Sequence, residues 1–452
     1  MNLSLPVRQC LTAVLAIAAT TASVSADETR PSAKKKEQPP VVHPQIGTRA
    51  SSADGEIEII LADKRQYYLN GPSETRDRDI ISPKSVHVSP DGSKFYVNSL
   101  EGARTVVYDA RTHRKINVIS HVIGAEHDSL WAPPTQLYTF RHDYGNERRF
   151  TGKPVESTFS HGGRYLWVPY YRRSFDINAQ DPSAVAVIDT RTDKIARLLD
   201  TGPLPKMIAT SPDGKTIAVS HWGDNTIGII DISSTEPAEW HNVTYYTVDH
   251  KLRLDFSLTK PVDRDNGSGN ALRGTVFTPD GRYLLVGCMG GCGGIAVVDI
   301  KNGRYLGKIL GMMPNLRHMI ISGGYLYLSI NSAGYVQRIP LQKILDTASN
   351  MDGRNVTLKG WSNCKVGAGA RTIAATPDGR YILAACNSVS KLYVVDTRTM
   401  KVATSIEVDS YPVGLDISHD GRWAYVTSQG RDHKGGNCLT VYCLNRRSSA
   451  NK

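Results

Sequence analysis

The sequence contains no run of about 18 apolar residues, the length that a helix needs to cross a lipid bilayer. It also lacks a Cys-x-x-Cys-His segment for attached haem, paired Cys-x-x-Cys segments for structural zinc, and a Gly-x-Ser-x-Gly nucleophile elbow. These absences argue against a membrane-spanning helix, a c-type cytochrome, a zinc ribbon and a common serine hydrolase. What remains is a chain of 452 residues with 40% hydrophobic and 21% charged residues, a composition that fits a soluble globular protein.

The N-terminal residues differ in composition from the rest of the chain. Arg8 is followed by an apolar stretch and then by Val-Ser-Ala at 24–26, a pattern that fits a signal-peptidase site, so residues 1–26 are predicted to be a secretory signal peptide. Residues 27–54 are polar and rich in proline without a hydrophobic period, which predicts a disordered leader. We therefore expect a periplasmic or secreted protein.

Charge and cysteine content bound the partners and the redox state. The formal net charge is +11, which favours acidic partners but does not choose among nucleic acid, glycan, lipid headgroup and protein. Of seven cysteines, Cys10 lies in the predicted signal peptide, and the six others are an even number in an exported chain, so disulfides are allowed. We expect Cys288 and Cys292 to be able to close a small loop, and Cys364 and Cys386 to be able to bridge adjoining strands.

One unit recurs along the chain. A short apolar strand leads to a Ser-Pro-Asp-Gly turn or a relative of it, in which proline fixes φ, aspartate bonds nearby amides and glycine takes a conformation that other residues avoid. Three more strands follow, the third usually ending in Asp. The turns begin at Ser89, Ser160, Ser211, Thr278, Thr376 and Ser418, and a shortened copy lies at 321–330. Four strands of about five residues in each copy describe one blade of a β-propeller.

The segments SPDGKTIAVSHWGDNTIGIIDIS, from Ser211, and TPDGRYILAACNSVSKLYVVDTRTMKVATSIEV, from Thr376, resemble the YVTN repeat family of bacterial extracytoplasmic β-propellers. The predicted fold is therefore all-β, a seven-bladed β-propeller over residues 55–445 with a C-terminal tail at 446–452. The last copy lacks its outer strand, and GEIEIILAD at 55–63 has strand character. We expect this N-terminal strand to pair with the last blade and close the ring, which hides the sheet edges.

The resemblance implies that the first strand of each copy lines a central axis and that long insertions gather on the top face. These insertions are 121–152, 170–183, 257–270 and 429–437. Insertions that gather on one face usually mark the binding face of a repeat protein.

A basic residue recurs five positions before the Ser or Thr that opens the turn. Five of the seven copies have it, at Lys84, Lys206, Arg273, Arg317 and Arg371, while the other two copies have valine. In the implied topology these cations circle the upper mouth of the axial channel, where they would attract an anion. The alternative is that each cation pairs with a carboxylate of the neighbouring blade and has a structural role only.

Aromatic and histidine side chains are expected at the same rim. Tyr170, Tyr171, His221 and Trp222 follow second strands, and His318 adjoins a cation of the first strand. Aromatic rings beside cations can stack sugars or nucleobases, or they can simply pack the insertions onto the blades.

A metal site is an alternative use of the histidines. His221, His318, His127, His142 and Glu126 would suit a divalent metal if they met above the channel, as in propeller lyases and lactonases. No spacing in the sequence enforces such a meeting, and a lone histidine more often bonds a backbone group.

The sequence thus favours a binding or scaffold protein, and not an enzyme, that engages an anionic small molecule, a glycan or a protein segment at the basic mouth. No cofactor is expected. A metal-assisted lyase or hydrolase is the first alternative. A binder of single-stranded nucleic acid is the second, because of the charge, the aromatic residues and an association of such binding with a periplasmic member of the resembled family.

Overall fold

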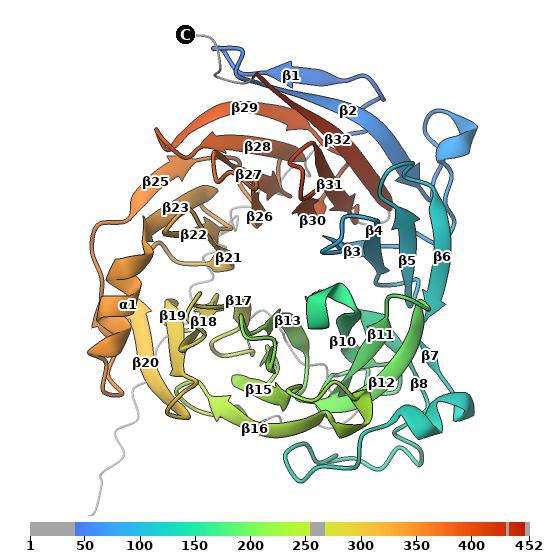
Figure 1. Ribbon diagram of the computed structural model, residues 1–452, viewed down its shortest axis with the longest axis vertical. Helices are drawn as coiled ribbons and strands as arrows, with labels where there is room; N and C mark the ends of the chain where they lie inside the picture. Colours follow the sequence, from blue (N-terminus) through green and yellow to red (C-terminus); the bar gives the residue numbers. More distant parts are fainter. Residues whose placement is uncertain (1–40, 254–266, 431–433, 448–452) are drawn as a thin grey trace, which may run out of the picture. The chain divides into compact units, whose positions relative to one another are not determined.

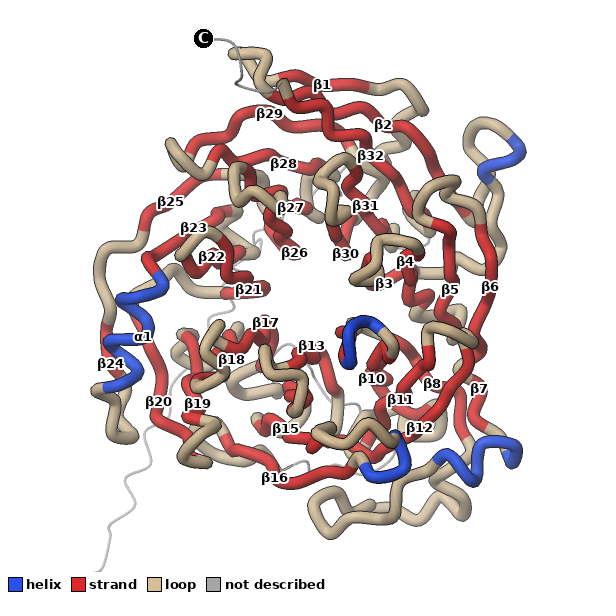
Figure 2. The backbone as a smooth tube through the Cα atoms, viewed as in Figure 1, coloured by secondary structure: helices blue, strands red, loops and turns tan. Residues whose placement is uncertain are grey.

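The computed structural model describes residues 41–253, 267–430 and 434–447. The chain divides into residues 1–39 and 40–452, and the fold is that of the second unit. Seven sheets stand around a central axis with their first strands innermost (Figure 1). The predicted all-β, seven-bladed β-propeller is therefore confirmed. Strands are the predominant regular secondary structure (Figure 2). Among the described residues, no helix is long and apolar enough to cross a membrane.

Antiparallel strands run outward from the hub in each blade. The first three blades consist of β3 (Pro83–Val88), β4 (Lys94–Ser99), β5 (Arg104–Asp109) and β6 (Lys115–Ser120); β9 (Thr158–Ser160), β10 (Tyr165–Arg173), β11 (Ser183–Asp189) and β12 (Lys194–Thr201); and β13 (Pro205–Thr210), β14 (Thr216–His221), β15 (Thr226–Asp231) and β16 (His241–Thr247).

The next three blades follow the same order. They consist of β17 (Leu272–Phe277), β18 (Tyr283–Cys288), β19 (Ile295–Asp299) and β20 (Arg304–Leu310); β21 (Leu316–Ser322), β22 (Tyr325–Ile330), β23 (Tyr335–Pro340) and β25 (Ser362–Lys365); and β26 (Ala370–Ala375), β27 (Tyr381–Cys386), β28 (Lys391–Asp396) and β29 (Lys401–Glu407).

The seventh blade joins the two ends of the propeller. Its strands from the hub outward are β30 (Pro412–Ile417), β31 (Trp423–Ser428), β32 (Cys438–Arg446), β2 (Ile57–Gln66) and β1 (Arg49–Ser51). β2 pairs with β32 in antiparallel fashion along its whole length, which confirms the predicted ring closure. β1 lies inside the segment 27–54, which we predicted to be disordered. It is a strand because its backbone pairs with β2. The expected signal peptide at 1–26 lies outside the described residues.

The recurrent turns have the predicted chemistry. In the five turns that contain the aspartate, the opening Ser or Thr hydroxyl donates to it, as from Ser89 to Asp91 and from Thr376 to Asp378. The same carboxylate accepts the amide of the residue two positions further on, as from Arg380. The glycine has a positive φ, 69° at Gly92, which residues with a side chain rarely adopt. Sequence reasoning placed these turns correctly because each one depends on local contacts only.

Two insertions elaborate the ring. The first, 121–152, adds β7 (Val122–Ile123) and β8 (Phe150–Pro154) to the second blade and a short 3-10 helix over Ala125–Leu130. The second carries helix α1 (Leu341–Ser349) and β24 (Val356–Thr357), which pairs in parallel with β20 at the rim (Figure 2). The expected insertion at 257–270 lies mostly outside the described residues.

Neither expected disulfide is formed, because all six cysteines of the described chain are free thiols. Cys364 and Cys386 share an apolar cluster, and burial raises the pKa of Cys386 to about 12. Cys288 is buried at the end of β18, while Cys292 is exposed, with its Sγ 3.6 Å from Lys308 Nζ. Burial thus keeps Cys386 of the first pair and Cys288 of the second as neutral thiols.

Candidate functional site

The innermost strands share a β-bulge near their upper ends. The pairing of first and second strands shifts by one residue in six blades, between Pro83 and Ser85, Pro205 and Met207, Leu272 and Thr275, Leu316 and His318, Ala370 and Ile373, and Pro412 and Gly414. The predicted basic positions fall inside these shifts. A bulge leaves one residue out of the ladder and re-aims its side chain. The bulges therefore explain why one register delivers its side chains to the hub.

Bonds from neighbouring blades hold the backbone of these positions in place. A hydroxyl of one blade donates to the carbonyl oxygen at the equivalent position of the next blade. The pairs are Ser85 with Val155 at 2.7 Å, Ser220 with Arg273 at 3.3 Å, Ser329 with Arg371 at 2.5 Å and Thr372 with Val413 at 2.6 Å. The side chains at the hub therefore start from a rigid frame, as a preorganised site requires.

Four of the five predicted cations influence one another across the channel, and we call Lys84, Arg273, Arg317 and Arg371 the hub cluster. They come from four different blades, so only inward-pointing side chains can bring them together. Burial and repulsion by Arg371 and Arg273 hold the pKa of Lys84 well below its usual range. Burial and Arg371 lower the pKa of Arg273 to about 10. The hub cluster is thus a concentration of like charges, of which Lys84, Arg273 and Arg371 are buried and Arg317 is partly buried.

Little negative charge balances the hub cluster. Lys84 is 7% exposed, Arg273 5% and Arg371 6%. Glu156 is a carboxylate that influences all of them, and burial raises its own pKa while the cations oppose that shift. Within residues 41–253, 267–430 and 434–447, no carboxylate oxygen lies within 4.0 Å of a hub-cluster nitrogen. Four cationic side chains thus share one nearby carboxyl group, and basic groups predominate at the hub.

Lys206, the fifth predicted cation, joins the site through aromatic rings. Its ammonium lies 3.7 Å from the ring centre of Tyr171 and 5.3 Å from that of Trp222. The guanidinium of Arg273 also lies over Trp222, 5.2 Å from its ring centre. Trp222 is only 4% exposed, so it packs between two cations and does not offer a face for stacking a base. The structure therefore brings Tyr171 and Trp222 to the site as its wall.

Tyr170 and His221, which we predicted at the same rim, turn into the blades. The Tyr170 hydroxyl bonds to His121 Nδ1 at 2.9 Å, and both residues are fully buried. His221 bonds to Thr226 through Nδ1 and to Thr201 through Nε2, both at 2.8 Å. Both ring nitrogens are thus used to tie strands together, and these two residues are structural.

The five residues of the metal hypothesis do not meet. His142 bonds to Asp181 at 2.6 Å, and His127 accepts the amide of Gly124, both within or beside the first insertion. That insertion lies alongside the outer strand of its blade, since Trp131 forms a β-bridge with Leu198 of β12. His318, by contrast, lines the axial channel. In the part of the chain that the structure describes, no three histidine, cysteine or acidic side chains are grouped as metal ligands.

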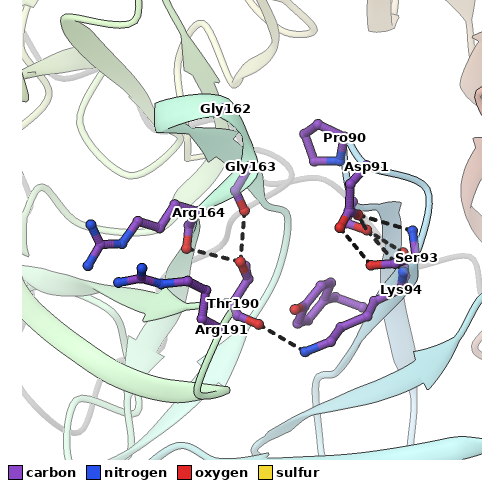
Figure 3. A pocket seen from close by; sticks show the side chains of 11 residues that line it. Pro90, Asp91, Ser93, Lys94, Gly162, Gly163, Arg164, Thr190 and Arg191 are labelled. Atoms are coloured by element: carbon purple, nitrogen blue, oxygen red, sulfur yellow. Dashed lines mark hydrogen bonds between the residues drawn. The ribbon is translucent and has the colours of Figure 1, made fainter.

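Two cavities differ in how their charges are balanced. One of about 440 Å³ lies between the first two blades, on the side of the turns (Figure 3). There Lys94 donates to the carbonyl of Thr190 at 2.9 Å, and Arg164 and Arg191 each lie 3.6 Å from Asp189. The other, of about 380 Å³, is the axial channel beside Glu156. The cations of the first cavity have partners. The axial cavity contains no lysine or arginine in its own wall, but Ser85, His318 and Thr372 in that wall directly follow Lys84, Arg317 and Arg371, so the cavity adjoins the hub cluster and is the stronger candidate site.

Sequence reasoning missed four residues of the site. Glu156 follows the valine of the second blade in the basic register, and His87 lies three positions after Lys84. The sulfur of Met289 accepts a hydrogen bond from Arg317 at 3.2 Å. Burial lowers the pKa of Arg371, and Tyr411 opposes that shift. Aligning the residues one and three positions after the basic register in every copy would have identified Glu156 and His87 as further candidates. The two others come from loops that share no register.

Comparisons with known proteins agree with the fold. The chain is a seven-bladed β-propeller with a cationic hub. No family model matches it. Antigen Lp49 of Leptospira interrogans is 24% identical over 281 residues, which are 57% of this chain and 53% of that protein. The chain thus spans about half the length of this curated relative.

Two solved structures share the architecture. Hydrazine synthase of Kuenenia stuttgartiensis aligns with a TM-score of 0.56 at 16% identity, covering 84% of this chain and 99% of that chain. The β-propeller domain of Cps50 (Swd1) from Myceliophteria thermophila aligns with a TM-score of 0.54 at 12% identity, covering 80% and 96%. At such identities the likeness shows the fold alone.

Proposed function

We propose that the protein binds a small anion of at least two negative charges in the hub cluster. The observation that carries the proposal is the set of four cations from four blades with one carboxylate between them. Burying an unpaired charge is unfavourable by several kcal/mol, and a fixed group of like charges adds repulsion. A multivalent anion removes both terms at once, so the site gains most from such a ligand.

The geometry of the side chains favours an oxyanion. Three of the four cations are arginines, whose planar guanidinium groups grip carboxylate or phosphate through two parallel hydrogen bonds. The Nε of Arg273 is buried and has no hydrogen-bond partner among the described residues. An oxyanion at the centre would supply the missing acceptor. The rigid frame of bulges keeps the binding groups in place before the ligand arrives.

Titration calorimetry with inorganic phosphate and citrate at low ionic strength tests this proposal. Arg371→Met is expected to weaken binding about 10- to 150-fold, the range that a lost hydrogen bond to a charged group gives. Arg111→Met, at an exposed position of the loop after β5, is the matched control and should leave the affinity unchanged. Equal affinities of wild type and Arg371→Met for both anions would contradict the proposal.

We also propose that the protein is exported and belongs with the YVTN-type propellers. The support is the order of basic, apolar and small residues in the segment 1–26, together with the repeat pattern. Mass spectrometry of the protein made in a bacterial host with its leader is expected to find a mature N-terminus at Asp27. A protein that keeps Met1 through residue 26 would oppose export by this route.

A further inference from the structure

The axial channel continues beyond the hub cluster with a different chemistry. Its cavity of about 380 Å³ is lined by Glu156 and His318, one position after the basic register, and by His87 and Asp416, three positions after it. An extended strand rises about 3.3 Å per residue, so His87 lies about 10 Å along the channel from Lys84. The channel is therefore cationic at one level and lined by imidazole and carboxyl groups at the next.

The groups of this second level can both donate and accept hydrogen bonds. Burial lowers the pKa of His87 and of His318 to about 4, so both rings are neutral near pH 7. A neutral imidazole offers one donor and one acceptor. His87 Nε2 is buried and has no hydrogen-bond partner in the described chain. Asp416 is held by the amides of Val88 and Ile417, both at 2.8 Å.

From this arrangement we propose that the ligand is a phosphate monoester of a polyhydroxylated compound, a sugar or a polyol. Its phosphate lies in the hub cluster, and its hydroxyl groups extend along the channel to His318, Glu156 and His87. The inference rests on the proposed anion binding and adds the class of ligand. The cavity has room for about a dozen water molecules at about 30 Å³ each, within the range of small-molecule pockets.

Other ligand ends fit the second level less well. An apolar tail would cover the partly buried His87 and Glu156 without offering them hydrogen-bond partners, which is unfavourable. A second cationic end would be repelled by the arginines of the hub cluster, about 10 Å or less away. A hydroxyl group donates to a carboxylate and exchanges both kinds of bond with imidazole. The pattern of the wall thus selects hydroxyl groups.

Titration calorimetry with three ligands of similar charge tests the inference on the full chain. Sorbitol 6-phosphate is expected to bind about tenfold or more tightly than inorganic phosphate, as one or two extra hydrogen bonds allow. Butyl phosphate, an ester without further hydroxyl groups, is expected to gain nothing. His87→Leu should remove the advantage of sorbitol 6-phosphate, whereas His87→Asn, which keeps a donor and an acceptor, should retain most of it.

The outcomes separate this inference from the proposed function. If all three compounds bind equally, or if His87→Leu keeps the tenfold advantage, the ligand class is overturned while anion binding stands. If none of them binds, both proposals fail. Thermal unfolding of the two His87 variants checks that they are folded. Should His87→Leu fail to fold, the comparison of sorbitol 6-phosphate with butyl phosphate on the wild type still decides.

Discussion

Replacing Arg273, Arg317 and Arg371 together by methionine is expected to stabilise the protein in a buffer without multivalent anions. Methionine keeps much of the side-chain volume and removes the charges of the buried Arg273 and Arg371 and of the partly buried Arg317, which repel one another. Replacing buried charges by apolar groups of similar volume can raise the free energy of unfolding by about 1–4 kcal/mol. Urea unfolding followed by circular dichroism measures this difference. Saturating phosphate should reverse the order, because only the wild type gains binding energy.

Arg173 provides a control, because its replacement by methionine is expected to lower the free energy of unfolding. It is 1% exposed, pairs with Asp200 and lies over the rings of Trp131, Phe140 and Phe150. Arg173→Met removes the partner of Asp200, whose side chain is 18% exposed, and the donor to the buried carbonyl of Ser183, so it should lower the free energy of unfolding by about 1–3 kcal/mol. If the triple hub variant were destabilised in the same way, the hub cations would have structural partners, and the account of the site would be wrong.

Ile59→Asp in β2 is expected to prevent stable closure of the ring. The Ile59 side chain is fully buried between the sixth and seventh blades, in one cluster with Ile57 and Leu61. A buried carboxylate without a partner is unfavourable by several kcal/mol, and an opened ring exposes strand edges. The free energy of unfolding in urea should fall by about 4 kcal/mol or more, with association visible by light scattering.

Glu58→Ala is the matched control on the other face of the same strand. Glu58 pairs with Arg49 at 3.8 Å in a partly exposed position. Such a pair contributes about 0–1 kcal/mol, so this variant should remain close to the wild type. Equal effects of Ile59→Asp and Glu58→Ala would mean that β2 does not hold the ring together.

The fold could be predicted because its information is local and repeated. Each turn is specified by a hydroxyl, an aspartate and a glycine within a few residues, as at Ser89–Gly92. The closing strand followed from counting strands in the last copy. β1 was missed, since three residues without an apolar period carry no signal until β2 offers them a ladder.

The candidate site could be predicted in part. The basic register was visible in the sequence, but the bulges that turn it toward the hub arise from pairing and leave no mark in composition. Tyr170 and His221 turn into the blades, where they bond His121 and Thr201, and these partners are distant enough in the sequence that no local pattern reveals them. The first insertion was expected on the top face, and no pattern in the sequence indicated that Trp131 would bridge it to Leu198 of the outer strand β12.

Anomalous diffraction from crystals soaked in selenate would test the central claim most directly. Selenate carries two negative charges and has nearly the shape of phosphate, and selenium marks its position without ambiguity. The account predicts one strong peak per chain on the axis, within hydrogen-bond distance of Arg273, Arg317 and Arg371. A channel free of selenate, with peaks only at exposed lysines and arginines, would contradict it.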